Sequence, residues 1–316
     1  MKTLLRLPNW LGDFVMSLPI IRALEKKNPD LICFGLGHFS ALYPLFGFQA
    51  EFAALPPKNH KLQYFRYFLS QRGQFERTIS LANSERADLE CFLTGAKNRY
   101  GVAWAGRRRL LVNKKYVLEQ DFRKDARHQV AIWQDFLRHF ELAEDLDFSP
   151  FQIRSSMEPS STKKISLICG SENSPEKRWS PEKYADLIRE IKNNFVDTEI
   201  VLLGTKKDFA ICEQIAACNK EVKNLAGTTN LREFAEHLAA SALVVGNDTG
   251  GIHLANAFGI ATIALFGPTN PTKTAPIFSA PLAIIQPENC PETGGADIDE
   301  ITVEKVLLQV EKILSN

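Results

Sequence analysis

The chain has 316 residues, 45% of them apolar and 24% charged, which is the composition of an ordinary globular protein long enough for two domains. No apolar run approaches the ~20 residues that a membrane-spanning helix needs. The start of the chain does not have the pattern of a signal peptide, because Arg6, Pro8 and Asp13 interrupt the apolar segment. We therefore expect a cytoplasmic protein.

The charge is unevenly divided, although the net charge is only +1. Residues 1–150 carry 22 Lys and Arg against 16 Asp and Glu, or +6, and the remainder carries 16 against 21, or −5. A basic half suits an anionic partner or an anionic membrane surface. The clusters at 107–109 and 114–115 can equally be solvated surface residues. No stacking aromatic residues are interleaved with them, so we expect no nucleic-acid partner.

Several enzyme classes have no signal in the chain. The six cysteines are scattered without a Cys-x-x-Cys pair, so we expect reduced core or surface thiols. There is no His-x-x-x-His pair or carboxylate triplet, and we expect no metal. Neither a Gly-x-Gly-x-x-Gly after the first strand nor a Gly-Lys-Ser/Thr occurs, which disfavours nicotinamide dehydrogenases and P-loop enzymes.

The first half of the chain alternates short apolar runs with amphipathic segments, the pattern of a parallel sheet covered by helices. In the first predicted helix, Val15, Leu18, Ile21 and Leu24 lie near one face, and Pro29 ends it. We predict strands at 4–7, 31–36 and 78–81, and helices at 14–27 and 130–140.

The same alternation restarts in the second half, after a linker at 149–164 that is rich in Ser, Pro and charge. We therefore predict two α/β domains, residues 1–155 and 156–316, facing each other across a cleft at the carboxyl ends of their sheets. The last helix is expected to cross back onto the first domain. The predicted strands are 164–169, 199–203, 242–245 and 261–266, and the helices are 181–195, 208–218, 231–241, a segment from about 250, and 303–314.

A polar turn separates the strand at 242–245 from the helix that follows it. The turn contains Asp248, Thr249, Gly250 and Gly251, and His253 falls in the first turn of the helix. The first N–H groups of a helix have no internal partner, and its dipole favours negative charge there. Glycines let a phosphate approach that backbone. The turn therefore predicts a phosphate site, against the alternative of an ordinary strand–helix turn with an Asp cap.

Three segments carry a resemblance to a known family. The stretch GNDTGGIHLANAFGIATIALFGPTNPTKTAP at 246–276 resembles the signature region of the lipopolysaccharide heptosyltransferases, glycosyltransferase family 9. Members have an Asn-Asp-Ser/Thr-Gly turn, a His three residues later, and Phe/Tyr-Gly-Pro-Thr/Ser after the next strand. RLPNWLGD at 6–13 is similar to the heptosyltransferase II branch, and KRWSPE at 177–182 matches the family's Lys-aromatic-Pro element. The resemblance covers nearly all of the chain.

The resemblance implies a GT-B fold, with two facing Rossmann-like domains, and an inverting glycosyltransferase. The implied donor is ADP-L-glycero-D-manno-heptose, which is a substrate, so no cofactor and no catalytic metal are expected. The implied acceptor is the heptosyl-Kdo2-lipid A inner core of lipopolysaccharide. That acceptor puts the enzyme at the cytoplasmic face of the inner membrane.

The same motifs suggest roles for individual residues. Asp13 is the expected general base, and the alternative is a first-turn acid that complements the helix dipole. Lys177 is expected beside the diphosphate, although without the resemblance a surface lysine is the better interpretation. His253 is either a phosphate ligand or a structural residue. The expected donor site comprises Lys177, Asp248, Thr249, Gly250, Gly251 and His253, with Gly204, Leu225 and Gly227 near the nucleotide and Asn9, Trp10 and Gly12 on the acceptor side.

Three other functions remain open. One is a transferase of the same family that uses another nucleotide sugar or acceptor. A second is a nucleotide-sugar-binding protein without catalysis, for which a base such as Asp13 has no purpose. The third is a nucleotide-sugar epimerase of similar architecture, which needs an acid and base pair near the sugar, whereas only Asp13 is well placed.

Overall fold

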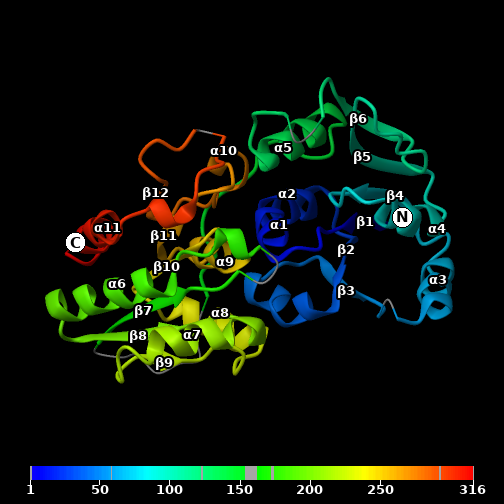
Figure 1. The fold of residues 1–316 in the computed structure, drawn as a ribbon. Coiled ribbons are helices and arrows are strands. Elements are labelled where there is room, and N and C mark those ends of the chain that lie inside the picture. The colour runs from blue at the N-terminus through cyan, green and yellow to red at the C-terminus, as the bar shows by residue number, and fades with distance from the viewer. Residues whose placement is uncertain are drawn as a thin grey trace. The chain divides into compact units, whose positions relative to one another are not determined.

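The computed structural model describes residues 2–57, 59–121, 124–153, 162–171, 174–291 and 293–315. The chain forms two compact units, Met1–Asp147 and Phe148–Asn316, and Figure 1 shows its path through both. The division therefore falls before the predicted linker at 149–164. Phe151 belongs to the second unit, because its N–H donates to the Ala257 carbonyl at 2.8 Å. Residues 154–161 of the predicted linker lie outside the described residues.

The first unit contains a parallel sheet of six strands in the order β3-β2-β1-β4-β5-β6. This is the strand order of a Rossmann sheet, and the order reverses direction between β1 and β4. The strands are β1 (Lys2–Arg6), β2 (Leu31–Leu36), β3 (Glu51–Leu55), β4 (Phe75–Ser80), β5 (Asn98–Trp104) and β6 (Lys114–Leu118).

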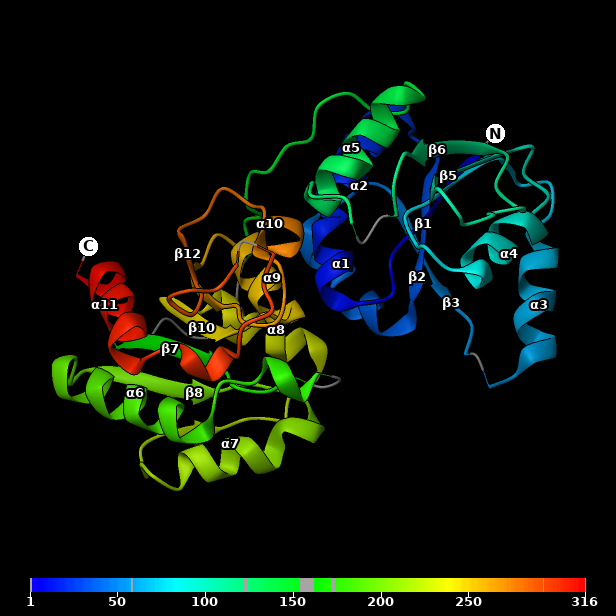
Figure 2. The ribbon, with the colours of Figure 1, turned by 45° about the horizontal axis from the view of Figure 1, so that its top comes forward.

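Helices cover the first sheet, and one of its cores lies under α3 and α4. That core joins Leu4 and Phe34 of the sheet to Phe68 of α3 and Cys91 of α4. Figure 2 shows α3 and α4 side by side. The helices are α1 (Leu11–Met16), α2 (Leu18–Lys27), α3 (Lys61–Ser70), α4 (Glu85–Leu93) and α5 (Gln129–His139), with 3-10 turns η1 (Gly37–Ala41) and η2 (Tyr43–Phe46).

The helix predicted at 14–27 is two helices, and this prediction was wrong in its continuity. α1 ends at Met16 and α2 begins at Leu18, with Ser17 between them. The cause is Pro19, which has no N–H to donate and whose ring crowds the carbonyl four residues earlier. The Ser17 hydroxyl donates to the Phe14 carbonyl at 2.6 Å and closes the end of α1.

The second unit repeats the architecture, with parallel strands in the order β12-β11-β10-β7-β8-β9. Its order reverses direction between β7 and β10. The strands are β7 (Lys163–Ile168), β8 (Thr198–Leu202), β9 (Lys223–Asn224), β10 (Leu243–Asn247), β11 (Ala261–Leu265) and β12 (Leu282–Ile285). Two such sheets confirm the predicted α/β class with paired Rossmann-like domains.

One face of the second sheet is covered by α6, α7 and α11, which bury a shared apolar core. The last helix buries Val306, Val310 and Leu314 in this core and packs against α6. Its apolar face is thus used within its own unit, and a crossing of this helix onto the first domain stays a prediction. The helices are α6 (Pro181–Asn194), α7 (Phe209–Ala216), α8 (Leu231–Ala239), α9 (Gly250–Ala257), α10 (Pro271–Thr274) and α11 (Val303–Leu314), with 3-10 turns η3 (Pro175–Lys177), η4 (Lys206–Asp208) and η5 (Ile298–Glu300).

Elements that the sequence pattern did not reveal are concentrated at the edges of the two sheets. They include β3, β5, β6, β9 and β12, together with α3 and α4. Edge strands are half exposed, as the mixed burial of β6 illustrates, so their hydrophobic period is weak. No helix in the described part of the chain is long and apolar enough to span a membrane.

Candidate functional site

The first unit has a pocket of about 770 Å³ at the carboxyl edge of its sheet. Ligands of doubly wound sheets bind outside the carboxyl ends of the strands, where the strand order reverses. The pocket lies there, because the segments following β1, β4 and β5 line it. The lining residues are Pro8, Asn9, Trp10, Asp13, Leu81, Ala82, Asn83, Ser84, Trp104, Ala105, Gly106, Arg107, Asp121 and Gln129.

Two of the three residues predicted on the acceptor side, Asn9 and Trp10, line this pocket together with Asp13. Asp13 is in the first turn of α1, and Trp10 caps the same helix with 65% of its surface exposed. Asn9 accepts a hydrogen bond from Arg6 Nη2 at 2.9 Å, which fixes its side chain. Gly12 lies between them on α1 without lining the pocket. The structure thus brings together Asn9, Trp10 and Asp13, whose chemical roles remain predictions.

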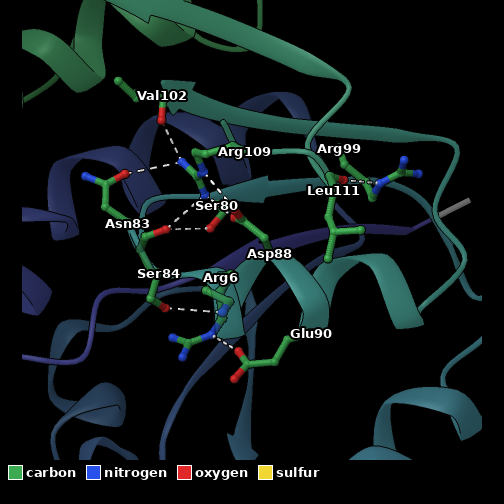
Figure 3. A network of polar contacts seen from close by, with 12 residues as sticks. Arg6, Ser80, Asn83, Ser84, Asp88, Glu90, Arg99, Val102, Arg109 and Leu111 are labelled. Atoms are coloured by element: carbon green, nitrogen blue, oxygen red, sulfur yellow. Dashed lines mark hydrogen bonds and ion pairs between the residues drawn. The ribbon is translucent and has the colours of Figure 1, made fainter. Parts of the chain in front are cut away.

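Two buried arginines, Arg6 and Arg109, donate hydrogen bonds to the pocket residues Asn9 and Asn83, respectively. Figure 3 shows both arginines among their polar contacts. The Nε atom of Arg6 lies 2.5 Å from Glu90 Oε2, with both side chains almost fully buried. Arg109 forms a bidentate pair with Asp88, and its Nη1 also donates to the Val102 carbonyl at 2.7 Å. Each guanidinium therefore has its donors committed within the protein.

This arrangement corrects the interpretation of the basic cluster at 107–109. Arg109 is only 2% exposed and is neither a solvated surface residue nor available to an anionic partner. Arg108 is exposed, whereas Arg107 lines the pocket. The guanidinium of Arg107 lies 4.6 Å from the centre of the Trp104 ring and donates to the Asn83 carbonyl at 2.8 Å. A cation stacked on an aromatic ring at a pocket rim is suited to sugar and phosphate groups.

Sequence reasoning missed Trp104, Arg107 and Asn83 as candidate site residues. All three depend on β4 and β5, and β5 was not predicted. The only available signal was the aromatic and basic composition at 104–109. Without the strand, nothing indicated which of the three consecutive arginines points into the pocket.

In the second unit, the corresponding position is the turn after β10, beside the end of β7. Asn247 is fully buried and ties the two strand ends together. Its Nδ2 donates to the Cys169 carbonyl at 2.9 Å, and its Oδ1 accepts from Tyr184 Oη at 3.0 Å and Trp179 N at 3.2 Å. Asn247 therefore fixes the turn against the segment that carries Lys177 and was not predicted to have this role.

Asp248 lies at the centre of the polar contacts of this turn. Its Oδ2 accepts from Lys177 Nζ at 2.8 Å and from Thr269 Oγ1 at 2.8 Å, and His253 Nε2 lies 3.9 Å from Oδ1. Burial by itself raises the pKa of the Asp248 carboxyl. The His253 imidazole and the Lys177 ammonium outweigh this effect and lower the pKa to about 2.

The start of α9 follows directly, with Thr249 at the N-cap and Gly250 as the first helical residue. The Thr249 side chain makes no capping hydrogen bond, and its buried Oγ1 has no partner among the described residues. Gly251 also has a packing role that the sequence did not suggest. A Cβ there would lie 2.6 Å from Ile168 Cδ1 and 2.9 Å from Phe234 Cζ, so this glycine permits core packing.

The three residues predicted near the nucleotide also come together at this edge of the sheet. Gly227 N donates to the Gly204 carbonyl at 2.9 Å, and Leu225 N donates to the Leu202 carbonyl at 2.9 Å. Gly227 has a φ of +72°, and a Cβ there would lie 2.7 Å from Lys206 Cα. The loops after β8 and β9 are therefore packed backbone to backbone, and only glycine fits at 227.

Among the described residues, no group of three or more His, Cys, Asp or Glu side chains is placed to hold a metal ion. Lys177, with 24% of its side chain exposed, places one positive charge at this turn. Burial raises the pKa of the Cys33 and Cys91 thiols to about 12, so neither is a nucleophile.

The chain is similar over most of its length to several known proteins. The lipopolysaccharide heptosyltransferase 2 of Salmonella typhimurium is 29% identical over 304 residues, covering 88% of this chain and 86% of that protein. Among solved structures, the Escherichia coli ADP-heptose LPS heptosyltransferase II has a TM-score of 0.81 at 24% identity, covering 100% of this chain and 99% of that one. The Escherichia coli heptosyltransferase WaaC with ADP has a TM-score of 0.78 at 16% identity, covering 99% and 100%.

These similarities establish the fold as the GT-B fold of the heptosyltransferases. A family model matches most of the chain, including β10 and the turn at Asp248. Residues 69–295 match the model of glycosyltransferase family 9 (heptosyltransferase), and the chain therefore belongs to that family of transferase enzymes.

Proposed function

We propose that this enzyme transfers heptose from ADP-L-glycero-D-manno-heptose to the heptosyl-Kdo2-lipid A inner core of lipopolysaccharide, with inversion at the anomeric carbon. Family membership supports transfer of a sugar, and the relatives named heptosyltransferase 2 support the choice of donor and acceptor. One structural observation supports the assignment of roles. A carboxylate lines the pocket at the switch point of one sheet, and a lysine is held at that of the other.

On the donor side, the departing diphosphate gathers negative charge as the sugar leaves. Lys177 supplies a positive charge, and the backbone amides of Thr249, Gly250 and Gly251 at the start of α9 supply donors. Asp248 is itself an anion and acts as the anchor that holds Lys177 at 2.8 Å. His253, almost fully buried behind this pair, supports the carboxylate. Gly204, Leu225 and Gly227 form the wall for the nucleoside.

On the acceptor side, Asp13 accepts the proton of the attacking hydroxyl. Its place in the pocket wall supports this role, because Trp10 and Asn9 line the same wall and can contact a sugar. The Arg107–Trp104 pair at the rim supports recognition of the phosphorylated, anionic core. Gly12 has no side chain that could obstruct an acceptor beside the first turn of α1.

An inverting transfer is a single in-line displacement. The acceptor oxygen forms a bond to the anomeric carbon while the bond from that carbon to the diphosphate oxygen breaks. Asp13 takes the hydroxyl proton, and ADP leaves with the electron pair of the broken bond. Lys177 and the α9 amides supply the stabilisation that a metal provides in other enzymes. The acceptor is a membrane lipid, so the enzyme would work at the cytoplasmic face of the inner membrane.

The decisive experiment incubates the purified chain with ADP-, UDP- and GDP-sugars and a set of core lipids truncated at successive sugars. We expect one heptose to be added, from the ADP donor only, to the acceptor that ends in the first heptose, as mass spectrometry would detect. Reactions without the protein serve as the control for background transfer. Transfer from another donor, or onto another acceptor, would replace this assignment with a different specificity in the same family. Interconversion of free nucleotide sugars without acceptor would indicate an epimerase.

A further inference from the structure

The outward face of α3 is apolar. Leu62, Phe65 and Leu69 are 66%, 39% and 45% exposed, respectively. Their spacing of three and then four residues puts them in one row along the helix. The exposed Arg66 lies beside this row. A helix on the surface of a soluble protein normally presents charged residues at such positions, so a row of three exposed apolar side chains is unusual.

The core of the first unit does not account for these three residues. α3 already packs against the sheet through its opposite face, where Tyr64 and Phe68 are 4% and 0% exposed. The ring of Phe68 lies 6.2 Å from that of Phe34 on β2, and the ring of Tyr64 lies 5.1 Å from that of Phe68. The helix is therefore anchored from within, and its outer row is free to meet a second surface.

The chain segment that carries this row has charged residues of a single sign. Residues 52–75 contain four basic residues (Lys58, Lys61, Arg66 and Arg72) and no Asp or Glu. Arg66 and Arg72 are exposed, and neither forms an ion pair with another described residue. The first unit as a whole is basic, with 22 Lys and Arg against 16 Asp and Glu in residues 1–147.

Another exposed apolar residue provides the contrast. Leu308 on α11 is 50% exposed, but that helix also carries Glu304, Lys305, Glu311 and Lys312, so its charges cancel. An isolated exposed leucine among mixed charges is ordinary surface. The combination of an apolar row with unopposed cations is found on α3. That combination is typical of a helix that lies at a membrane interface.

We propose that the outer face of α3 docks on an anionic phospholipid bilayer. Leu62, Phe65 and Leu69 enter the interfacial region, and Arg66 and Arg72 meet lipid phosphates. The inference deepens the proposed function, since a lipid-linked acceptor presents its sugars at such a surface, but docking itself requires neither donor nor acceptor. A second copy of this chain fits the same face poorly, because pairing two α3 helices would bring their arginines together.

The test is co-sedimentation of the full-length protein with vesicles of phosphatidylcholine alone and of phosphatidylcholine mixed with phosphatidylglycerol. We expect binding to the mixed vesicles that weakens as salt is added. The variant L62E/F65E/L69E should lose at least about tenfold in partition coefficient, since each substitution removes an apolar group and adds a repelled charge. The matched control Leu308→Glu, on the other unit, should bind like the unsubstituted protein.

A second variant, R66Q/R72Q, keeps the apolar row and removes two charges. Its partition coefficient should fall by roughly fivefold per arginine at low salt. If the triple variant fails to fold, R66Q/R72Q still tests whether α3 docks on anionic vesicles. Equal binding by the unsubstituted protein and both variants, or no binding of the unsubstituted protein to anionic vesicles, would overturn the proposal. A dimer in light scattering that the triple variant abolishes would overturn it in favour of self-association.

Failure of docking and failure of the proposed function are distinguishable with a water-soluble acceptor. The triple variant should transfer heptose to a delipidated core oligosaccharide at the rate of the unsubstituted protein, and lose rate only on acceptor embedded in vesicles. Retained vesicle binding without any heptosyl transfer would leave docking intact and refute the function. Loss of rate on the vesicle-embedded acceptor in the Leu308→Glu control as well would count against a specific role of α3.

Discussion

In the first unit, the segments at the β1–β4 switch point offer side chains: a carboxylate, an exposed indole and an arginine stacked on a second indole. In the second unit, the segments at the β7–β10 switch point offer the start of a helix and one lysine held by a buried aspartate. The strand orders of the two sheets are equivalent. The fold therefore fixes where a ligand binds, and the loops decide which chemistry meets it.

The two buried arginines of the first unit differ from Lys177 of the second unit in how many of their donors are occupied by protein groups. Arg6 and Arg109 are almost fully buried, and carboxylates and carbonyls occupy their donors. Among the described residues, the Lys177 ammonium donates to the Asp248 carboxylate and carbonyl alone, and 24% of its side chain is exposed. A cation that is needed for structure is saturated with partners, whereas one that can bind a ligand retains both exposure and free donors.

The largest effect should come from Asp13→Asn, which keeps the shape of the pocket wall and removes the base. General-base catalysis typically contributes about 10²–10⁴-fold, so single-turnover transfer should slow by that factor. Calorimetric affinity for ADP should stay unchanged, because the donor residues lie in the other unit. Asp121→Asn, the other pocket carboxylate, is the matched control and should leave the rate nearly unchanged. A parallel loss of ADP affinity in the Asp13 variant would move Asp13 to the donor site.

The next effect concerns stability. Arg109→Met removes one partner of a buried ion pair and leaves Asp88 uncompensated, which costs about 3–5 kcal/mol in free energy of unfolding. Its neighbour Arg108 is exposed, so Arg108→Met should change the free energy by less than about 0.5 kcal/mol. Urea denaturation of the two variants measures both values. Equal values would mean that Arg109 is not a structural cation, and the contrast with Lys177 would disappear.

Lys177→Met should weaken ADP binding. A hydrogen bond to a charged group is worth about 1.5–3 kcal/mol, or roughly 10- to 150-fold in dissociation constant. Lys220→Met, at an exposed position of the same unit, is the matched control and should bind ADP like the unsubstituted protein. Unchanged affinity in the Lys177 variant would show that this lysine only neutralises Asp248.

The smallest effect is on the pH dependence of stability. The pKa of Asp248 is about 2 in the folded protein against an ordinary 3.8. A depressed folded-state pKa stabilises the protein above pH 3.8, and the stabilisation is lost as the pH falls toward 2. The shift corresponds to about 2 kcal/mol. The difference in unfolding free energy between the unsubstituted protein and Asp248→Asn should therefore narrow by that amount over this interval. Parallel curves for the two proteins would contradict the assignment.

Local periodicity was enough to predict the central strands and most of the covering helices. The strand at 31–36 and the helix at 303–314 were predicted with the bounds that the structure shows. Buried strands and amphipathic helices repeat over short distances, so their signal is complete within one window of sequence. The continuity of 14–27 was predicted wrongly, because the apolar face continues through Pro19 although the backbone cannot.

The polar contacts of the candidate site depend partly on local turn patterns and partly on residues that are distant in the sequence. The turn at Asp248–Gly251 and the position of Asp13 after the first strand could be read from the sequence, because each is a local strand–turn–helix pattern. The carboxyl-edge rule then put them at ligand-binding positions. Their partners could not be read in the same way. Thr269, which contacts Asp248, lies 21 residues away and reaches it only because β10 and β11 are neighbours in the sheet.

The arginines at 107–109 show most clearly where prediction from the sequence ends and tertiary structure is needed. The sequence by itself determined two Rossmann-like sheets, a polar turn between a strand and a helix, and a carboxylate after the first strand, since these follow from periodicity and turn chemistry. It could not assign three consecutive, chemically identical residues to a pocket rim, to solvent and to a buried ion pair. Only the tertiary structure decided that assignment, because it depends on how the chain leaves β5 and on the position of Asp88, 21 residues earlier on α4.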